Sequence, residues 1–232
     1  MKLNVHKLAR MMDFSAVRTD VDEAEIREMV AQARKCHCLC VFPMPCYATL
    51  CRELLAGSRD VGLGGVVGFP SGAHATATKV AEARMLLAEG AVELDMVINV
   101  GLLRSQRYDC VEKDIRAVVA AARGVPVKVI LEVHYLNDEQ IKRGSELCVR
   151  AGAAFVKTAT GWTATGATPH NVSLIKAAVG KAAGIKAAGG VRDLKTLLEL
   201  YRCGATRFGI SHKSGAKILE ECAALPGGEL EL

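Results

Sequence analysis

Short runs of aliphatic residues alternate along the chain with longer segments whose apolar positions recur every three or four residues. The short runs are bounded by Gly, Pro or polar residues, which is typical of buried strands. Seven runs fit well, at residues 39–42, 61–67, 92–98, 127–133, 155–158, 185–188 and 208–210, and residues 10–15 form a weaker candidate for the first strand.

The longer segments have the periodicity and the end signals of amphipathic helices. Residues 22–35 carry an apolar stripe, and residues 76–89 stop at Gly90, where a glycine suits a left-handed helix cap. Asn137, followed three residues later by Gln140, has the form of a capping box. Strands and helices are therefore expected to alternate along most of the chain.

Eight strand–helix units in 232 residues amount to about 29 residues each, close to the size expected in a (β/α)8 barrel. We predict an α/β protein with one barrel domain over residues 1–232, in which residues 1–9 form an N-terminal extension. A doubly wound open sheet is the alternative. It normally carries a glycine fingerprint in the turn after its first strand, whereas Gly64 and Gly65 lie inside a predicted strand.

The composition narrows the range of partners. Aromatic residues make up 4% of the chain, and the net charge of +5 is spread without a block of like charges, which argues against nucleic-acid binding. No run approaches the roughly 18 apolar residues that span a membrane, and the first residues lack the apolar core of a signal peptide. Nine cysteines, an odd number in a chain of this length, indicate reduced thiols and a cytoplasmic protein.

Three of the cysteines, Cys36, Cys38 and Cys40, alternate as the side chains on one face of a strand would. A zinc site needs about four ligands that converge on one point, whereas these side chains would spread along the strand. We therefore interpret them as packing residues. Cys40 falls near the predicted mouth of the barrel and is a candidate reactive thiol.

Ionisable residues interrupt four of the predicted strands, although strands of a buried parallel sheet should be almost purely apolar. Alternation places Glu93, Asp95 and Asn99 on one face of their strand, and Lys128 and Glu132 on one face of the next. In a barrel, such faces are expected to point into the interior, toward the C-terminal mouth where active sites lie.

Lys157 and Lys186 occupy the centres of two further strands, so that with Lys128 three lysines are expected to meet near Asp95. Burial and like-charged neighbours lower the pKa of a lysine, and a neutral amine can attack a carbonyl carbon. The pattern predicts Schiff-base chemistry and leaves open which lysine is the nucleophile. The alternative is that these residues form interior ion pairs without a catalytic role. Three lysines at equivalent heights of neighbouring strands argue against this alternative.

Glycines and hydroxyl groups follow the last three predicted strands. Thr160 comes after the sixth, Gly189 and Gly190 after the seventh, and residues 209–215 after the eighth. The loops after strands 7 and 8 of a barrel often bind phosphate through backbone N–H groups, together with a helix N-terminus. The joint position of these residues predicts a phosphate-binding site.

Taken together, these segments resemble the deoxyribose-phosphate aldolase family, whose members are class I aldolases with a (β/α)8 barrel. The resemblance runs from about residue 13 to about residue 219. It rests on ordered blocks at residues 68–72 (GFPSG), 93–99 (ELDMVIN), 127–132 (VKVILE), 155–158 (FVKT), 160–161, 166–168 and 186–192 (KAAGGVR), with Lys79 and Glu82 after the first of them.

The resemblance implies a role for each candidate residue. Lys157 matches the lysine that forms the Schiff base, Lys186 the second lysine that perturbs it and helps to move protons, and Asp95 the acid–base carboxylate. The substrate-binding residues that the resemblance implies are Asp13, Lys128, Thr160, Gly189, Gly190, Gly209 and Ser211.

The reaction that the resemblance implies is the reversible cleavage of 2-deoxy-D-ribose 5-phosphate to acetaldehyde and D-glyceraldehyde 3-phosphate, in deoxyribonucleotide and carbohydrate breakdown. It implies a small phosphorylated partner, no metal and no other cofactor. The chain departs from the family pattern at residues 13–15 and 211–213, and Phe42 stands where a polar residue is common. An aldolase of the same chemistry on another phosphorylated aldehyde or ketose is therefore an alternative, as is a non-catalytic barrel that binds a sugar phosphate. A homo-oligomer is compatible with the sequence.

Overall fold

Eight parallel strands close into a barrel in the computed structural model, which describes residues 2–225 and 229–231. Each strand pairs with the next along the chain and the last pairs with the first, so the barrel has no free edge. The strands are β2 (Met12–Ala16), β3 (Cys40–Pro43), β4 (Gly62–Val67), β5 (Glu93–Val97), β6 (Val127–Ile130), β7 (Phe155–Lys157), β8 (Gly184–Ala188) and β9 (Arg207–Ser211).

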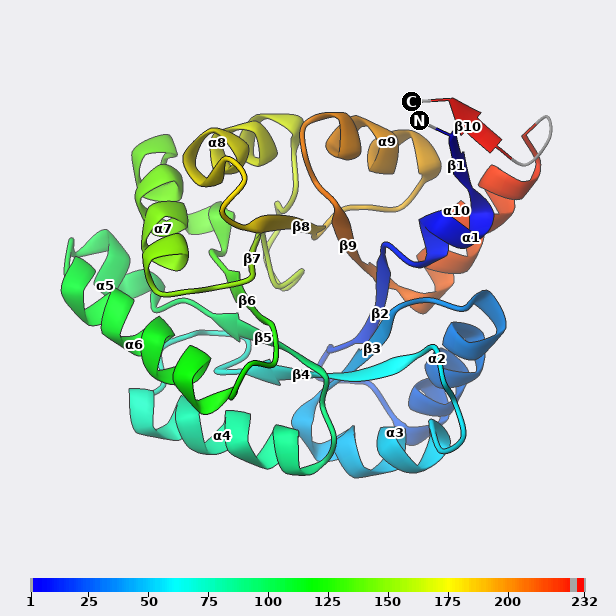
Figure 1. Ribbon diagram of the computed structural model, residues 1–232, viewed down its shortest axis with the longest axis horizontal. Helices are drawn as coiled ribbons and strands as arrows, with labels where there is room; N and C mark the ends of the chain where they lie inside the picture. The colour runs from blue at the N-terminus through cyan, green and yellow to red at the C-terminus, as the bar shows by residue number, and fades with distance from the viewer. Residues whose placement is uncertain (1, 226–228, 232) are drawn as a thin grey trace.

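Helices surround the barrel on its outside (Figure 1). Their buried apolar faces pack on the strands and form the main core. They are α2 (Glu23–Cys36), α3 (Ala48–Leu54), α4 (Thr76–Ala88), α5 (Val100–Arg104), α6 (Tyr108–Ala121), α7 (Asp138–Arg150), α8 (Pro169–Val179), α9 (Leu194–Arg202) and α10 (His212–Ala223), with 3-10 turns at Pro45–Tyr47 and Val133–Tyr135. Within the described residues, none of these helices has the length and apolar character needed to cross a membrane.

The segment predicted as an N-terminal extension has a structure of its own. It forms β1 (Lys2–Asn4) and the short helix α1 (Val5–Ala9). β1 pairs antiparallel with β10 (Glu229–Glu231), so the two ends of the described chain lie side by side beside the barrel (Figure 1).

The barrel predicted from the hydrophobic pattern is confirmed. All eight predicted strands are present, the weak candidate at residues 10–15 included, and the open-sheet alternative is wrong because β2 pairs with β9. Gly64 lies inside β4, as expected, and the capping box formed by Asn137 and Gln140 begins α7.

Two residues predicted to face the barrel interior do not lie in strands. β6 ends at Ile130, and Glu132 follows in a left-handed conformation with φ of 55°, which turns its side chain away from Lys128. Asn99 lies beyond the end of β5, and its side chain caps α5. Strict alternation failed at both places because each strand ends before the charged or polar residue.

The register of the strands places the remaining charged residues on one face, the barrel interior. Asp95 of β5 pairs with Lys128 of β6, and Lys157 of β7 pairs with Lys186 of β8. Side chains alternate between the two faces of a strand, so residues in register on adjacent strands point the same way. Lys157 pairs with Ile130, two residues beyond Lys128, and therefore lies on the same face as Lys128. All four side chains thus point into the barrel.

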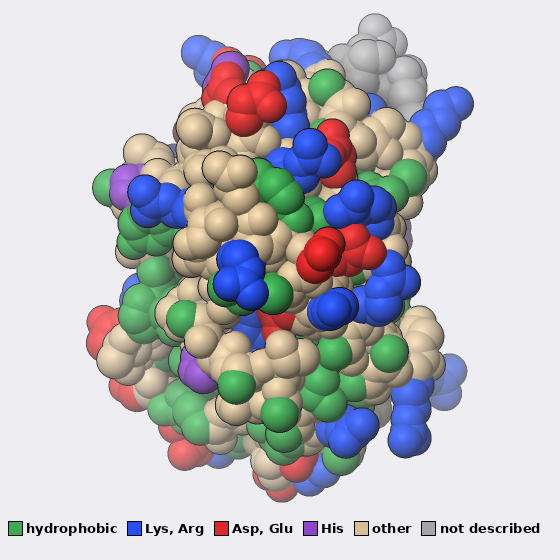
Figure 2. Space-filling view, turned by 90° about the vertical axis from the view of Figure 1, so that its left-hand side faces the viewer, with side chains coloured by type: hydrophobic (Ala, Val, Ile, Leu, Met, Phe, Trp, Pro, Cys, Tyr) green, Lys and Arg blue, Asp and Glu red, His purple; other side chains and the backbone are tan. Residues whose placement is uncertain are grey.

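Acidic and basic side chains are interspersed over the face that carries α5, α6 and α7 (Figure 2). Surface ion pairs on this face include Arg116 with Glu112, which is partly buried, and the exposed pair Arg143 with Glu146. A surface that binds the phosphates of a nucleic acid is instead dominated by clustered basic residues. This face is therefore not the basic surface of a nucleic-acid-binding protein.

Candidate active site

Asp95 lies at the centre of the barrel interior and contacts three lysines from the next three strands. Its Oδ1 atom accepts a hydrogen bond from Nζ of Lys128 at 3.0 Å, and its Oδ2 atom accepts one from Lys157 at 2.8 Å and one from Lys186 at 2.7 Å. Asp95 is fully buried. The convergence predicted from the sequence is confirmed.

A second layer of charges lies beneath these residues. Nζ of Lys186 is 2.6 Å from Oδ2 of Asp13, and Nζ of Lys128 is 2.6 Å from Oε2 of Glu93. Arg207 of β9 contacts both of these carboxylates. We call the whole set the buried charge cluster; it consists of Asp13, Glu93, Asp95, Lys128, Lys157, Lys186 and Arg207.

The electrostatics single out Lys157. Burial, reinforced by the cations Lys186 and Lys128, lowers the pKa of Lys157 to about 8, although Asp95 opposes the shift. Lys128 behaves in the opposite way, because three carboxylates, those of Asp95, Asp13 and Glu93, outweigh its burial and raise its pKa. A substantial fraction of Lys157 is therefore a neutral amine near pH 8, while Lys128 stays charged.

Two acidic members of the cluster, Asp95 and Asp13, are held as carboxylates. Burial alone would raise the pKa of Asp95, but Lys128, Lys157 and Lys186 outweigh it and bring the pKa well below its usual value. Burial would also raise the pKa of Asp13, but Lys186, Lys128 and Arg207 outweigh it and lower that pKa. Oδ2 of Asp13 accepts no well-aligned hydrogen bond from the described residues, so its stabilisation comes from the ammonium charges beside it.

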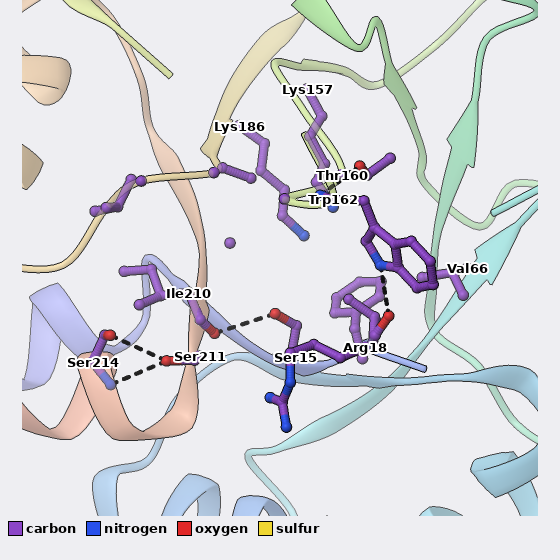
Figure 3. A pocket seen from close by; sticks show the side chains of 18 of the residues that line it. Ser15, Arg18, Val66, Lys157, Thr160, Trp162, Lys186, Ile210, Ser211 and Ser214 are labelled. Carbon is purple, nitrogen blue, oxygen red and sulfur yellow. Dashed lines mark hydrogen bonds between the residues drawn. The ribbon is translucent and has the colours of Figure 1, made fainter. Parts of the chain in front are cut away.

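A cavity of about 280 Å³ opens above Lys157 and Lys186 at the C-terminal mouth of the barrel (Figure 3). Both lysines line it, whereas the other members of the buried charge cluster do not. A carbonyl compound in this cavity can reach the amine of Lys157 directly. It can exchange protons with Asp95 only through one of the two lysines or a water molecule.

One end of the cavity has the features of an anion site. Gly189 and Gly190, with φ of 82° and 94°, line it, and so do Gly209 and Ser211. Ser211 caps α10, and its Oγ atom accepts a hydrogen bond from the N–H of Ser214 (Figure 3). Backbone N–H groups at such a helix N-terminus favour an anion.

The wall opposite this end is apolar. The ring of Phe42 lies over the ammonium groups of Lys186 and Lys128, at 4.1 Å and 4.4 Å from its centroid. Gly64 makes room for this ring, because a Cβ atom there would lie 2.3 Å from it. Val66 extends the same wall of the cavity. An aromatic face stabilises a nearby cation and also excludes water from it.

Trp162 lies across the rim of the cavity. Its indole N–H donates to the carbonyl of Val17 at 2.8 Å, which links the loop after β7 to the loop after β2 (Figure 3). Its ring meets the ring of Phe69 edge-on, with centroids 6.0 Å apart. The loop that follows Lys157 is thereby fastened over the mouth of the barrel.

A family model described as DeoC/LacD family aldolase matches residues 7–216. The chain belongs to this family. A deoxyribose-phosphate aldolase of Klebsiella pneumoniae is 46% identical over 97% of the chain and 92% of its own length. Deoxyribose-phosphate aldolase 1 of Bacillus licheniformis is 44% identical over 94% of the chain and 97% of its own length.

The solved structures agree with this assignment. A deoxyribose phosphate aldolase from Aeropyrum pernix, described as having a unique tetrameric structure, superimposes with a TM-score of 0.86 at 30% identity. The match covers 95% of this chain and 93% of that one. The protein is therefore an aldolase, a lyase that acts on carbon–carbon bonds, with a barrel of the same fold as this relative.

The candidate residues of the aldolase fall into two groups by location. Those that line the cavity are Lys157, Lys186, Thr160, Gly189, Gly190, Gly209 and Ser211. Asp95, Asp13 and Lys128 are fully buried one layer below them. The sequence implied substrate contacts for Asp13 and Lys128. Asp13 instead contacts Lys186, Lys128 contacts Asp95, and neither residue lines the cavity.

Glu132 proves to support the cavity loop. Its carboxylate accepts a hydrogen bond from the hydroxyl of Thr160 and lies 3.3 Å from the backbone N–H of that residue. The hydroxyl of Thr163 is also 3.3 Å away. Glu132 thus holds the loop after β7, which is a different role from the pairing with Lys128 that alternation predicted.

Cys40 does not have the environment of a reactive thiol. It is buried, and burial, with Asp13 and Glu93 nearby, raises its pKa, so the thiol stays protonated. These three residues lie close enough together to hold a metal ion. Their carboxylates are already neutralised by Arg207 and Lys128, so a cation does not fit this site. Cys36 ends α2 and shares no strand with Cys40, which corrects the alternating-strand interpretation.

Arg207 is the member of the site that the sequence analysis missed. It comes directly before the strand that the apolar run predicts at residues 208–210. β9 in fact begins at Arg207, which pairs with Lys186 in the strand register. A charged residue at the edge of a buried apolar run was the available signal.

Proposed function

We propose that the protein is a class I aldolase that reversibly cleaves 2-deoxy-D-ribose 5-phosphate to acetaldehyde and D-glyceraldehyde 3-phosphate, with Lys157 as the Schiff-base nucleophile. The observation that carries this proposal is the amine of Lys157, which lines the cavity, has a pKa lowered to about 8, and donates to Asp95. The names of its relatives support the choice of substrate.

The substrate binds with its phosphate at the anion end of the cavity. The backbone N–H groups near Gly189 and Gly190 and at the start of α10 bind the phosphate, and Ser211 adds a hydroxyl. This anchor is remote from the reacting bond, so its binding energy orients the aldehyde carbon toward Lys157.

Imine formation begins with neutral Lys157, which attacks the aldehyde carbon C1 to give a carbinolamine. Loss of the C1 oxygen as water gives a protonated imine. Lys186 supplies the proton that this oxygen needs, since it lines the cavity and shares Oδ2 of Asp95 with Lys157. Asp95 stabilises the positive imine nitrogen that replaces the lysine charge.

Cleavage follows when a base removes the proton of the C3 hydroxyl. The C2–C3 bond breaks, its electrons move to the imine nitrogen to form an enamine, and glyceraldehyde 3-phosphate leaves. Asp95 and Lys186 relay the proton through a water molecule, because Asp95 has no surface in the cavity. Protonation of the enamine at C2 and hydrolysis of the imine then release acetaldehyde and restore Lys157.

The substrate is tested by comparing release of the aldehyde products from deoxyribose 5-phosphate, deoxyribose 1-phosphate and unphosphorylated deoxyribose. We expect the highest kcat/KM for the 5-phosphate. Faster turnover of another phosphorylated sugar would favour an aldolase with the same chemistry on that substrate. An absence of any turnover would support a barrel that only binds a sugar phosphate.

Replacing Lys186 with methionine is expected to move the acid limb of the kcat/KM profile upward from about pH 8. The cation of Lys186 disfavours a proton on Lys157, so its loss raises the pKa of Lys157 by about one unit, and less of the amine is neutral at a given pH. Initial rates measured across roughly pH 6–10, the range in which lysines of lowered pKa titrate, give the shift. An unchanged or lower midpoint would refute this role for Lys186.

Replacing Ser211 with alanine is expected to raise KM for deoxyribose 5-phosphate roughly tenfold and to leave KM for unphosphorylated deoxyribose unchanged, since one hydrogen bond to a charged group is lost. The variant also loses the cap of α10. Asn137→Ala is the matched control, because it removes the cap of α7 outside the cavity. An equal rise in KM for both sugars would contradict a phosphate contact.

Two further features concern the location and assembly of the protein. All nine cysteines are free thiols, which favours a reducing, cytoplasmic location. The tetrameric relative from Aeropyrum pernix favours a homo-oligomer. Light scattering on the purified protein tests the second inference, and a monomer mass would contradict it.

A further inference from the structure

Arg207 and Glu93 form a two-point ion pair below the lysines. One guanidinium nitrogen of Arg207 donates to Oε1 of Glu93 at 2.9 Å, and the other donates to Oε2 at 3.1 Å. The second nitrogen also donates to Oδ1 of Asp13 at 2.6 Å. Arg207 and Glu93 are both nine-tenths or more buried, and neither lines the cavity. A planar guanidinium in such a fork fixes the carboxylates in orientation as well as in charge.

Each carboxylate held by Arg207 in turn holds a lysine. Glu93 lies 2.6 Å from Nζ of Lys128, which donates to Oδ1 of Asp95. Asp13 lies 2.6 Å from Nζ of Lys186, which donates to Oδ2 of Asp95. Two chains of contacts therefore run from Arg207 to the two oxygens of Asp95, one through each lysine.

We propose that Arg207 and Glu93 are positioning residues that orient Asp95 toward Lys157 and set the charge balance that leaves Lys157 as the lysine without a proton. This inference rests on the proposed function of Lys157. It assigns the pair a duty in the reaction although neither residue reaches the substrate.

The number of charges in the buried charge cluster predicts the direction in which the pKa of Lys157 should change in each variant. Four basic and three acidic side chains leave one positive charge in excess, and loss of one proton from Lys157 balances them. Without the charge of Arg207, three lysines balance three carboxylates, so Lys157 should hold its proton more tightly. Without the charge of Glu93, four cations face two carboxylates, so Lys157 should lose its proton more easily.

The groups that face these residues from the neighbouring strands all belong to the cluster or are uncharged. Lys157 faces Asp95 of β5, Lys128 of β6 and Lys186 of β8. Arg207 faces Asp13 of β2, Glu93 of β5 and the ring of Phe155 in β7, the last at 5.6 Å. The protonated thiol of Cys40 in β3 lies 3.7 Å from Glu93. No titratable group outside this set competes for the excess charge among the described neighbours.

The test uses Arg207→Met, Glu93→Gln and the double variant that carries both changes. Each protein is incubated with acetaldehyde at a series of pH values and reduced with borohydride, and the initial rate of adduct formation gives the pH midpoint. We expect the midpoint to rise by about one pH unit in Arg207→Met and to fall by about one unit in Glu93→Gln. The double variant keeps the original excess of one charge, so its midpoint should return to that of the unchanged protein.

Opposite shifts of the pH midpoint in the two single variants distinguish the positioning role from a merely structural role. A structural role would lower the stability of both variants without moving their midpoints apart. Midpoints that do not move, or that move in the same direction, would overturn the proposal. If Arg207→Met does not fold, Glu93→Gln and Arg207→Lys keep the test decisive. The first should still shift the midpoint downward, and the second, which retains the charge, should lower kcat and leave the midpoint unchanged; any other result overturns the proposal.

A matched control is available on the surface. Arg143 and Glu146 of α7 form an exposed ion pair at 2.7 Å, and Arg143→Met and Glu146→Gln should leave the midpoint unchanged. The unchanged protein separates the two proposals. If it forms no adduct at Lys157, the proposed function fails; if it forms the adduct and the variants do not shift, only the assignment of the Arg207–Glu93 pair fails.

Discussion

Replacing Lys157 with alanine is expected to lower kcat for deoxyribose 5-phosphate by roughly 10⁴-fold or more, because the proposed Schiff-base nucleophile is gone. Neither Lys186 nor Lys128 can substitute for it. Lys186 is held between Asp95 and Asp13, and Lys128 is fully buried with a raised pKa. The measurement is the rate of glyceraldehyde 3-phosphate release at saturating substrate.

The Lys157→Ala variant should still fold, which makes the result interpretable. Removal of the Lys157 side chain leaves three basic and three acidic side chains in the buried charge cluster, so neither charge is in excess there. Circular dichroism and urea unfolding check the fold. Lys142→Ala, which changes a partly exposed side chain of α7 outside the cavity, is the control and should retain full activity. Retention of more than a hundredth of kcat in Lys157→Ala (about 3 kcal/mol of barrier) would reject Lys157 as the nucleophile.

Replacing Asp95 with asparagine is expected to lower kcat by roughly 10³-fold and the free energy of unfolding by about 3–5 kcal/mol. The kinetic loss follows from removal of the proton acceptor that Lys157 and Lys186 share. The loss of stability follows because the cluster would hold four basic side chains against two carboxylates in the barrel interior. Urea unfolding and steady-state kinetics on the same preparation measure both quantities.

A second buried ion pair separates the two effects of Asp95→Asn. Asp114 of α6 lies 2.6 Å from Nζ of Lys79 in α4, and both side chains are buried outside the cavity. Asp114→Asn should therefore lower the free energy of unfolding by a similar amount and leave kcat of the folded protein unchanged. Equal kinetic losses in the two variants would mean that Asp95 acts through stability alone.

The fold could be read from the chain because a (β/α)8 barrel repeats one local pattern. Each buried strand is flanked by helices on one side and the barrel interior on the other, so its hydrophobic run is distinct from the amphipathic helices. The strand ends were less well determined. Glu132 continues the alternation of β6 in the sequence but lies in a left-handed turn, and alternation alone contains no information about where a strand stops.

The site was predictable in part for a similar reason. Lysines and an aspartate in the middle of apolar strands are conspicuous, so Asp95, Lys128, Lys157 and Lys186 stood out without any structure. Arg207 did not, because it begins its strand and looks like an ordinary boundary residue. Its importance depends on contacts with Glu93 and Asp13, which are more than a hundred residues away along the chain.

The differing electrostatics of the lysines were also beyond the sequence. All three lie in apolar runs, yet Lys128 gains three carboxylate neighbours and Lys157 is mainly desolvated. Which lysine loses its proton therefore depends on the packing of several strands. The sequence alone predicted the class of chemistry, and the identity of the nucleophile came from resemblance.

The most direct test of Lys157 as the Schiff-base residue is to trap the imine. The protein is incubated with acetaldehyde at about pH 8, where roughly half of Lys157 is neutral, and is then reduced with borohydride and digested for mass spectrometry. We expect one stable two-carbon adduct per chain, on Lys157. An adduct on Lys186 or Lys128 instead, or no adduct while Lys157 is recovered unmodified, would contradict it.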